Sequence, residues 1–264
     1  MNQVTKKLVI LVAFLGLFFV SNCYAHFLWL NVDDYTPKPG QKISITLGWG
    51  HKFPETPNPP REEMIKKLNL FLIDPNGNKI RLKIPIKDGK PQPIKIKLTK
   101  EGVYFVVLIG KYFVSKTTEG YFLKAKSELK DKEVIYSKWS ETTAIALISV
   151  GKQKEISVSS IYGSNFYMLP FINPSLLKKG EIFQVKVLFD GKPCRTWVYA
   201  TYAEFSKFKD TYAWTIRTDK KGLAAIKILK TGVPWLIRSE LEKNYPNHQK
   251  ADIANYKCTL TFGF

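Results

Sequence analysis

Two of the three histidines in this 264-residue chain stand where their nitrogen atoms could hold a transition metal. The first is His26, which directly follows Cys23-Tyr24-Ala25, a small-x-small sequence of the kind found at signal-peptide cleavage sites. Cleavage after Ala25 would make His26 the first residue, so that its α-amino group and imidazole could chelate one ion. Imidazole nitrogen suits zinc, copper, iron and nickel. The other interpretation is a histidine that follows a signal peptide by chance.

The first 25 residues have the features of a secretory signal. Lys6 and Lys7 make a positive start, and an apolar run over residues 8–20 follows. This run is shorter than the roughly 20 residues that span a bilayer. We therefore expect residues 1–25 to be removed on export to the periplasm. In a competing process Cys23 would be lipidated and His26 would not be terminal. Asn22 is atypical before a lipidated cysteine, so simple cleavage is favoured.

The second histidine, His51, closes an alternating segment that reads as a strand and is bordered by Gly48 and Gly50. A turn at Pro39-Gly40 joins this segment to the strand that starts at His26. If the two strands pair antiparallel, the start of one lies beside the end of the other. The amine and imidazole of His26 would then reach the imidazole of His51, which is the three-nitrogen arrangement called a histidine brace. Placement in facing sheets is the alternative.

Other candidate ligands have simpler explanations. His248 lies in a polar segment before the last strand and is expected to be an exposed loop residue. Asp33, Asp34 and Glu55 could orient an imidazole, although turn and surface roles are favoured. The sequence leaves the third ligand open between His248, a carboxylate and water.

Composition and motifs limit the classes of function. The formal net charge is +19, but the basic residues are mostly lysines scattered through every segment, without a basic helix or an RNA-binding aromatic motif. We therefore expect no nucleic-acid partner and at most peripheral contact with a membrane. The chain has no nucleophile, phosphate-binding or HExxH motif, so we expect a protein that is not an enzyme. Cys194 and Cys258 could form a disulfide in an oxidising compartment or remain two buried thiols.

The exported part is predicted to be all-β. Apolar and polar residues alternate in short runs separated by Gly, Pro, Asn and Asp turns, as in β-sandwiches. A polar connector near residue 152 divides the chain into an N-terminal β-sandwich with the metal site, 26–152, and a C-terminal sandwich, 153–264. A hairpin is predicted around Pro75-Asn76-Gly77-Asn78. Short helices are predicted at Glu62–Lys67 and Thr118–Glu133.

Several short motifs occur in an order that resembles a known family. They are Ala25-His26-Phe27-Leu28-Trp29-Leu30, Gly50-His51-Lys52-Phe53-Pro54, Val187-Leu188-Phe189-Asp190-Gly191-Lys192-Pro193, Thr218-Asp219-Lys220-Lys221-Gly222, Gly232-Val233-Pro234-Trp235-Leu236-Ile237-Arg238 and Thr259-Leu260-Thr261-Phe262. This order is similar to a bacterial secreted family of unknown function described as the periplasmic component of cobalt or nickel transport systems. The resemblance implies a transthyretin-like, or prealbumin-like, C-terminal sandwich and association with metal uptake, with an ABC- or ECF-type permease as partner.

The chain departs from that family in one place. Relatives often have a histidine after the acidic residue that follows the Trp-Leu-x-Arg strand, and Leu241 stands there in this chain. If that histidine is a ligand in relatives, only His248 or Glu240 could replace it here.

The first functional hypothesis is therefore a periplasmic protein that binds a divalent transition metal, nickel, cobalt or copper, through His26 and His51. One alternative is a metal-free carbohydrate-binding or adhesion module, for which the six tryptophans could form a sugar platform. Another is a histidine-brace copper enzyme that oxidises polysaccharides, like the lytic polysaccharide monooxygenases.

Overall fold

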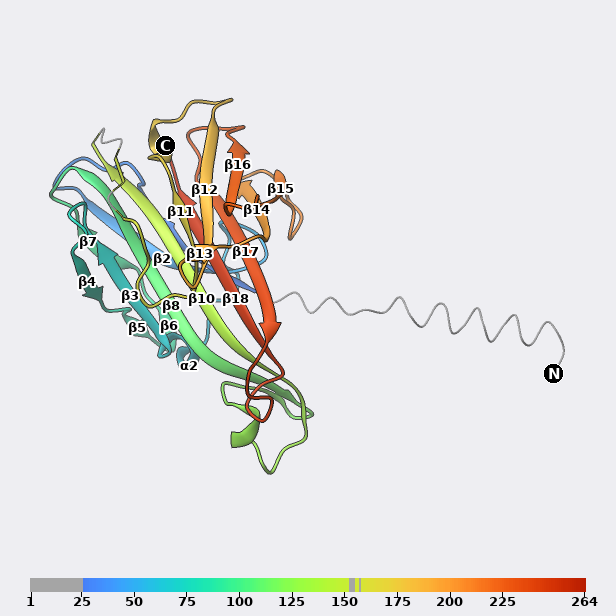
Figure 1. Ribbon diagram of the computed structural model, residues 1–264. Coiled ribbons are helices and arrows are strands. Elements are labelled where there is room, and N and C mark those ends of the chain that lie inside the picture. Colours follow the sequence, from blue (N-terminus) through green and yellow to red (C-terminus); the bar gives the residue numbers. More distant parts are fainter. Residues whose placement is uncertain (1–25, 152–154, 157) are drawn as a thin grey trace.

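The computed structural model describes residues 26–151, 155–156 and 158–264, so the predicted signal peptide lies outside the described residues. The described chain consists mostly of β-strands in several sheets, with very few helices (Figure 1). The all-β prediction is confirmed at that level. Within these ranges, no helix has both the length and the apolar character needed to cross a membrane.

The elements follow one another along the chain with short connections. They are β1 (Phe27–Val32), β2 (Lys42–Gly50), α2 (Glu62–Ile65), β3 (Leu68–Ile73), β4 (Lys79–Leu82), β5 (Ile86–Lys87), β6 (Lys90–Pro91), β7 (Ile94–Lys97), β8 (Gly102–Thr117), β9 (Gly120–Phe122), the 3₁₀ turn η1 (Lys126–Glu128), β10 (Val134–Val150), β11 (Phe166–Pro170), η2 (Pro174–Leu176), β12 (Ile182–Phe189), β13 (Lys192–Pro193), β14 (Trp197–Tyr202), β15 (Trp214–Arg217), β16 (Leu223–Lys227), β17 (Trp235–Asn244) and β18 (Ile253–Phe262).

The largest sheet of the described chain has nine strands in the order β15-β14-β17-β18-β10-β8-β3-β4, with β9 also paired to β8. Its neighbours pair antiparallel except β10 and β18, which run parallel over Lys138–Ala146 and Ile253–Thr261. This parallel pair joins strands from the two sides of the predicted boundary at residue 152. The boundary itself stays a prediction, while the sheet is common to both parts of the chain.

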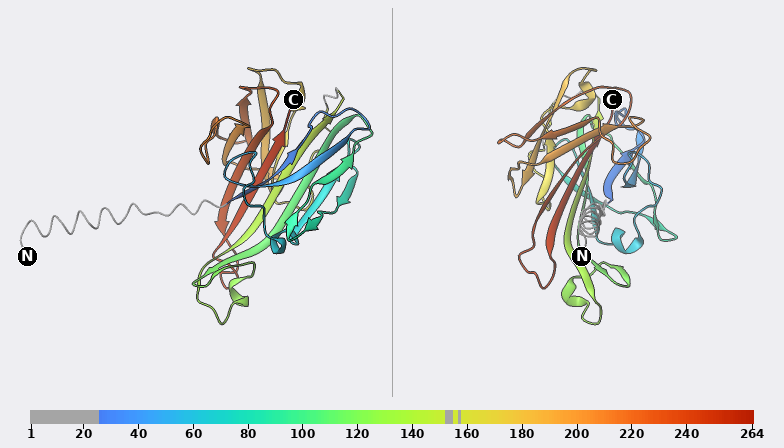
Figure 2. Two further views of the ribbon diagram at one scale, coloured as in Figure 1. Left: turned by 180° about the vertical axis from the view of Figure 1, so that it is seen from behind. Right: turned by 90° about the vertical axis from the view of Figure 1, so that its right-hand side faces the viewer.

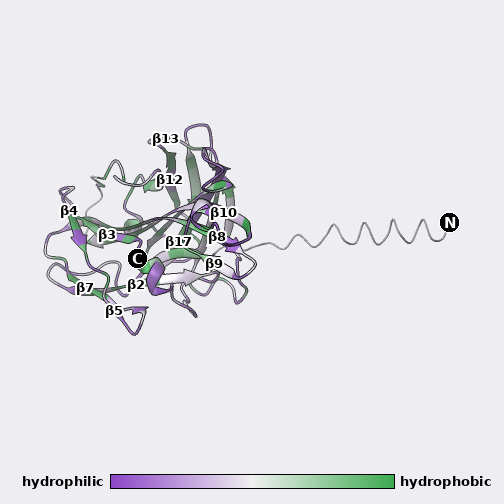
Figure 3. Ribbon diagram, turned by 90° about the horizontal axis from the view of Figure 1, so that it is seen from below, coloured by the Kyte–Doolittle hydropathy of each residue, from purple (hydrophilic) through white to green (hydrophobic). Residues whose placement is uncertain are grey.

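Both faces of the large sheet are covered by smaller sheets. The sheet β1-β2-β7 comes from the first part of the chain, and the sheet of β11, β12, β13 and β16 comes from the second. The edge-on view in Figure 2 shows these strands, blue and yellow, on opposite sides of the green and red strands. Since successive strand residues face opposite ways, Phe105 and Val107 enter one core and Val106 and Leu108 the other. Figure 3 shows hydrophilic residues concentrated in the loops around these layers.

Of the three local predictions, the hairpin and the first helix are confirmed and the second helix is wrong. The predicted hairpin exists as β3 and β4, where the Asp74 carboxylate accepts hydrogen bonds from the main-chain N–H groups of Asn76 and Asn78 at 2.9 and 2.8 Å. The first predicted helix is confirmed as the short α2. The predicted helix over Thr118–Glu133 is wrong. Its start belongs to a tight turn into β9, and its middle holds only the turn η1, since the segment lacks the apolar periodicity that would bury a longer helix.

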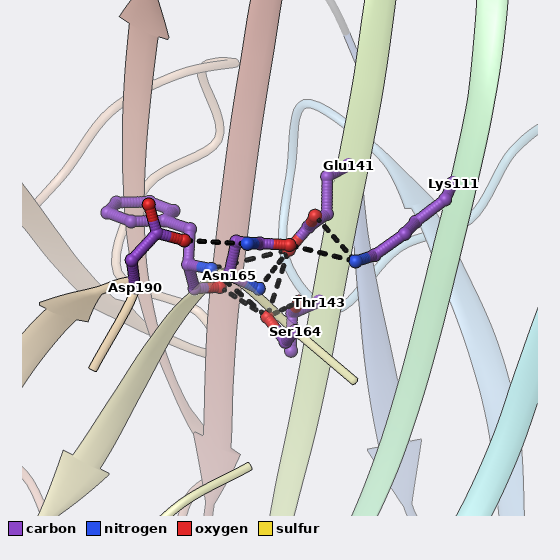
Figure 4. A network of polar contacts seen from close by, with 7 residues as sticks. Lys111, Glu141, Thr143, Ser164, Asn165 and Asp190 are labelled. Atoms are coloured by element: carbon purple, nitrogen blue, oxygen red, sulfur yellow. Dashed lines mark hydrogen bonds and ion pairs between the residues drawn. The ribbon is translucent and has the colours of Figure 1, made fainter. Parts of the chain in front are cut away.

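A buried carboxylate ties the second part of the chain to β10 (Figure 4). Glu141 is only 1% exposed and accepts hydrogen bonds from the main-chain N–H groups of Asn165 and Phe166. The Lys111 ammonium lies 3.1 Å from the same carboxylate, and Ser164 also donates to it. A buried charge is tolerated when it is paired and hydrogen-bonded in this way. The network fixes the chain where it enters β11.

The two cysteines of the described residues are free thiols, Cys258 buried in one core and Cys194 partly buried against that core. Burial raises the pKa of both thiols, and the neighbouring Cys194 raises that of Cys258 further. The structure therefore represents the reduced form, and disulfide formation stays a prediction.

Candidate metal centre

The two predicted histidines lie side by side. Strands β1 and β2 pair antiparallel with Phe27 opposite Gly50, so His26 just precedes the first strand and His51 just follows the second. The imidazole centroids are 4.5 Å apart, and the ring planes are inclined by 48°. The His26 ring also stacks on Trp49, with a centroid distance of 5.3 Å and an interplanar angle of 7°. The predicted antiparallel pairing is confirmed, and it brings the histidines together.

Strand β1 is an edge strand of its small sheet, and side chains of β18 satisfy its free carbonyl groups. Lys257 Nζ donates to the carbonyl oxygen of His26 at 3.3 Å. Thr259 and Thr261 donate through Oγ1 to the carbonyl oxygens of Leu28 and Leu30, at 2.8 and 2.7 Å. The donors and acceptors each alternate by two residues, which matches the period of a strand. This ladder holds the start of β1 in place and so determines where the main chain of His26 lies.

Asp210 orients the His51 ring from a distant part of the sequence. Its Oδ2 lies 3.1 Å from His51 Nδ1, and its main-chain N–H donates to the His51 carbonyl oxygen at 2.9 Å. Tyr212 donates through Oη to Oδ1 of the same carboxylate at 3.2 Å. In a neutral imidazole one nitrogen carries the proton and the other accepts. With the proton on Nδ1, directed at the carboxylate, Nε2 is left with the lone pair that a metal requires.

A small cleft lies beside His51 and Asp210, and Arg238 forms part of its wall. The Arg238 guanidinium lies 3.8 Å from the Phe27 ring centroid, 4.7 Å from that of Tyr199 and 4.6 Å from that of Tyr212. The cleft has a volume of about 20 Å³, room for about one water molecule. A sugar ring would not fit there, but a small ligand such as water or a monatomic ion would.

The surroundings of His26 favour the neutral form of its imidazole. Partial burial lowers the pKa of His26, and the positive charges of a protonated His51, Lys257 and Lys209 lower it further, while Asp210 opposes them. Burial raises the pKa of Tyr212, so its hydroxyl stays protonated and can donate to Asp210. The neutral imidazole is the form that coordinates metal.

The remaining predicted candidates lie elsewhere. His248 belongs to the turn between β17 and β18, close enough to Asp252 to lower the pKa of that carboxyl. Ile253, next to this turn, and Lys257, which contacts His26, are four residue steps or about 13 Å apart along β18. Asp33 accepts a hydrogen bond from the main-chain N–H of Ser44 in β2, Asp34 accepts one from Thr36 in a turn, and Glu55 pairs with Lys52. In the described part of the chain, these contacts of the three carboxylates are with main-chain N–H groups and a lysine.

The departure at Leu241 does not affect this centre. In β17, Leu241 packs against the core on the opposite face of the sheet from Arg238. Glu240 shares the face of the metal centre, where Asn255 Nδ2 donates to it at 2.7 Å and Lys257 lies 3.8 Å away. Of these two partners, Lys257 also contacts the main chain of His26.

Within the described ranges, no group of three or more His, Cys, Asp and Glu side chains could hold a metal ion. The two imidazoles therefore need a further donor, and the α-amino group of a processed His26 would supply it. Sequence reasoning missed Asp210, Tyr212 and Arg238. The pairing of β14 with β15 and β17 brings them here. Arg238 closes the 232–238 motif of the family resemblance, which was the signal that could have found it, while no motif contains Asp210 or Tyr212.

The chain was compared with solved structures and with curated proteins. It is similar to trypsin-activated α-2-macroglobulin from Escherichia coli at 8% identity and a TM-score of 0.26, covering 91% of this chain and 16% of that one. It is also similar to the BSP domain of a biofilm-associated protein at 11% identity and a TM-score of 0.21, covering 90% of this chain and 30% of that one. The chain thus spans less than a third of either protein. No curated protein matches it.

The comparison with protein families gives a match over most of the chain. Residues 23–243 match the domain of unknown function DUF4198. The matched range contains His26, His51, Asp210 and Arg238, and it ends within β17. The chain therefore belongs to the DUF4198 family.

Proposed function

We propose that this protein is exported to the periplasm and binds one divalent transition-metal ion through His26 and His51. The α-amino group and imidazole of His26 and Nε2 of His51 would be the ligands. The observation that carries the proposal is the contact between Asp210 and Nδ1 of His51, beside an imidazole 4.5 Å away. This contact favours the tautomer with the proton on Nδ1 and the lone pair on Nε2, and carboxylate partners of this kind orient metal-binding histidines in many proteins.

The metal would be nickel, cobalt or copper. An amine and two imidazoles suit all three ions, and the resemblance to a family described with cobalt and nickel transport favours the first two. We propose a role in metal uptake, with an ABC- or ECF-type permease as partner. The protein would bind and deliver the ion, and it would not be an enzyme.

We also propose the division of the fold into two β-sandwiches that the sequence predicted. The sheet β1-β2-β7 and the facing side of the large sheet would form the N-terminal sandwich, 26–152, that carries the metal. The sheet of β11, β12, β13 and β16 and the other side would form the C-terminal, transthyretin-like sandwich, 153–264. The core beneath β1-β2-β7 consists of residues before 152 alone, which supports this division, while the core on the other face also contains residues of β8 and β10 such as Phe105 and Ile145.

A titration of metal-free mature protein with Ni²⁺, Co²⁺ and Cu²⁺ tests the proposal. Calorimetry should give one tight site for at least one of these ions. His51→Ala should weaken that site by orders of magnitude, because it removes one of three ligands. His248→Ala is the matched control and should bind as the unsubstituted protein does. Equal affinity of the His51→Ala variant and the unsubstituted protein would contradict the proposal.

The copper-enzyme alternative uses the same ligands and needs a separate readout. If the copper-loaded protein consumed peroxide while it cleaved a polysaccharide, the binding-only role would be wrong. Metal binding without such turnover is the result that we expect.

A further inference from the structure

A second hollow lies on the same face of the large sheet as β1, beyond the N-terminal end of that strand. It has a volume of about 410 Å³ and is lined by residues of β8, β9, β10, β17 and β18. Asn255 and Ile253 line it, two and four residues before Lys257 on β18. Since Lys257 contacts the carbonyl group of His26, the residue before β1, this groove begins next to the start of β1. Figure 1 shows the lower ends of β8, β10, β17 and β18 extending together past the small sheets.

The groove exposes apolar and aromatic side chains to solvent. Tyr121 is 60% exposed, Ile135 is 57% exposed and Tyr136 is 38% exposed. Val114 and Ile253 line the groove as well. Ligand pockets commonly have volumes of about 300–1,000 Å³ and a mainly apolar lining with few polar groups. The size and the lining of this groove both match that description.

The charged residues of the groove are separated by sign. Glu240 and Glu242 are on β17, whereas Lys116 and Lys138 are on β8 and β10. Strand β18 lies between β17 and β10, so the acidic side and Lys138 are two strand spacings, or about 10 Å, apart. An extended chain of three residues has about the same length. A ligand with an ammonium group at one end and a carboxylate at the other would complement both sides.

The floor of the groove contains an acceptor without a partner. Asn255 is 4% exposed, and its Nδ2 donates to Glu240 at 2.7 Å. Its Oδ1 accepts no hydrogen bond from the described residues. A buried acceptor left in this state costs free energy, and most such groups in proteins do find a donor. Because Oδ1 is itself shielded from solvent, a small rotation of the Asn255 side chain would be needed before a ligand N–H group could donate to it.

We propose that this groove binds a short zwitterionic peptide of about three residues with an apolar side chain. The peptide amine would face Glu240 and Glu242, and the peptide carboxylate would face Lys138 and Lys116. The apolar side chain would pack on Tyr121, Ile135 and Tyr136. This site is separate from the metal centre and does not depend on the proposed metal function.

The test is an NMR titration of metal-free mature protein, with a chelator present, against the tripeptide Ala-Phe-Ala. The chelator matters because a free peptide amine binds metal itself. Saturable shifts of groove resonances are expected. N-acetylation or C-amidation of the peptide removes one charge and should weaken binding by up to about fivefold. Cellobiose, a neutral sugar of similar size, should not bind.

Two pairs of variants locate the site. Glu242→Gln should weaken binding of the free peptide but leave binding of the acetylated peptide unchanged. Lys138→Gln should weaken binding of the free peptide but leave binding of the amidated peptide unchanged. Glu63→Gln and Lys90→Gln, at exposed positions elsewhere, should have no effect. His51→Ala should also leave peptide binding intact, which separates this inference from the metal proposal. No saturable binding, equal binding of the capped peptides, or preference for cellobiose would overturn it.

Discussion

At the scale of residues, the chemistry of the proposed metal centre depends on how one imidazole is oriented. His51 alone could present either nitrogen. Asp210 contacts Nδ1 and receives a hydrogen bond from Tyr212 in turn. The carboxylate thus selects both the tautomer and the ring orientation, and it would raise the basicity of Nε2. Residues more than 150 positions apart in the sequence therefore act as one unit.

Replacing Asp210 tests this unit. Asp210→Ala removes the acceptor at Nδ1, and metal affinity should fall about 10- to 100-fold. Asp210→Asn keeps an acceptor oxygen but loses the charge, so its affinity should lie between those of the alanine variant and the unsubstituted protein. Competition with a chromophoric chelator measures both. Glu204→Gln, in the same loop between β14 and β15, is the matched control. If Asp210→Ala bound metal as tightly as that control, Asp210 would have no role in orienting His51.

At the scale of elements, the position of His26 depends on how β1 is attached to the large sheet. An edge strand leaves main-chain groups unpaired unless something covers them. Here the hydroxyl groups of Thr259 and Thr261 cover the carbonyl groups of Leu28 and Leu30. Threonine suits this task because its branched side chain also favours a strand.

Thr259→Val tests the attachment while nearly preserving side-chain volume. The substitution leaves the Leu28 carbonyl group buried without a donor, which should lower the free energy of unfolding by about 1–3 kcal/mol. Urea denaturation followed by tryptophan fluorescence measures the loss. The same change at Thr215, an exposed residue of β15, should cost much less. Equal losses at the two positions would show that the hydrogen bond is not the cause.

The β17–β18 turn is attached to β10 through Asp252, and this contact should make stability depend on pH. Burial alone would raise the pKa of Asp252, but hydrogen bonds from Lys126 Nζ and from the main-chain N–H of Ser137, both 2.7 Å long, lower it below its usual value of 3.8. A lowered pKa means that the carboxylate stabilises the fold above the unfolded pKa. That contribution disappears as the pH falls through the folded pKa.

Asp252→Asn should therefore lower Tm at pH 7, and the difference from the unsubstituted protein should shrink as the pH falls below about 4. Calorimetric melting curves at several pH values measure both. Asp131→Asn, at an exposed position, should show no such dependence. A constant difference between pH 7 and pH 3 would contradict a charged contact at Asp252.

Patterns in the sequence correctly predicted features that depend on residues close together along the chain. The alternation of apolar residues, the Pro39-Gly40 turn and the PNGN hairpin predicted the strands and the pairing that joins His26 to His51. The false helix at Thr118–Glu133 had suitable composition without apolar periodicity. Asp210 could not be found in this way, because its contact depends on the order β15-β14-β17-β18 and on a small sheet packed against it. A single sequence contains no local pattern that predicts long-range strand pairing of this kind.

At the scale of the whole molecule, the proposed metal centre needs residues from both parts of the chain. It also needs cleavage of the signal peptide beforehand. The first part supplies both histidines, and the second supplies Asp210, Arg238 and the side chains under β1. The large sheet holds these parts together through the parallel pair β10 and β18. The remaining ligand, the α-amino group of His26, would exist only after cleavage at Ala25. Export and metal binding would thus be linked.

The most direct measurement compares metal binding by two chains that differ only at the N-terminus. One begins at His26, and the other carries a single extra glycine before it. Every side chain is the same in both, but in the second the amine has moved away from its chelating position. Calorimetry with Ni²⁺ and Cu²⁺ should show affinity lower by orders of magnitude for the extended chain. Equal affinities would contradict the proposed chelate, even if both chains bound metal.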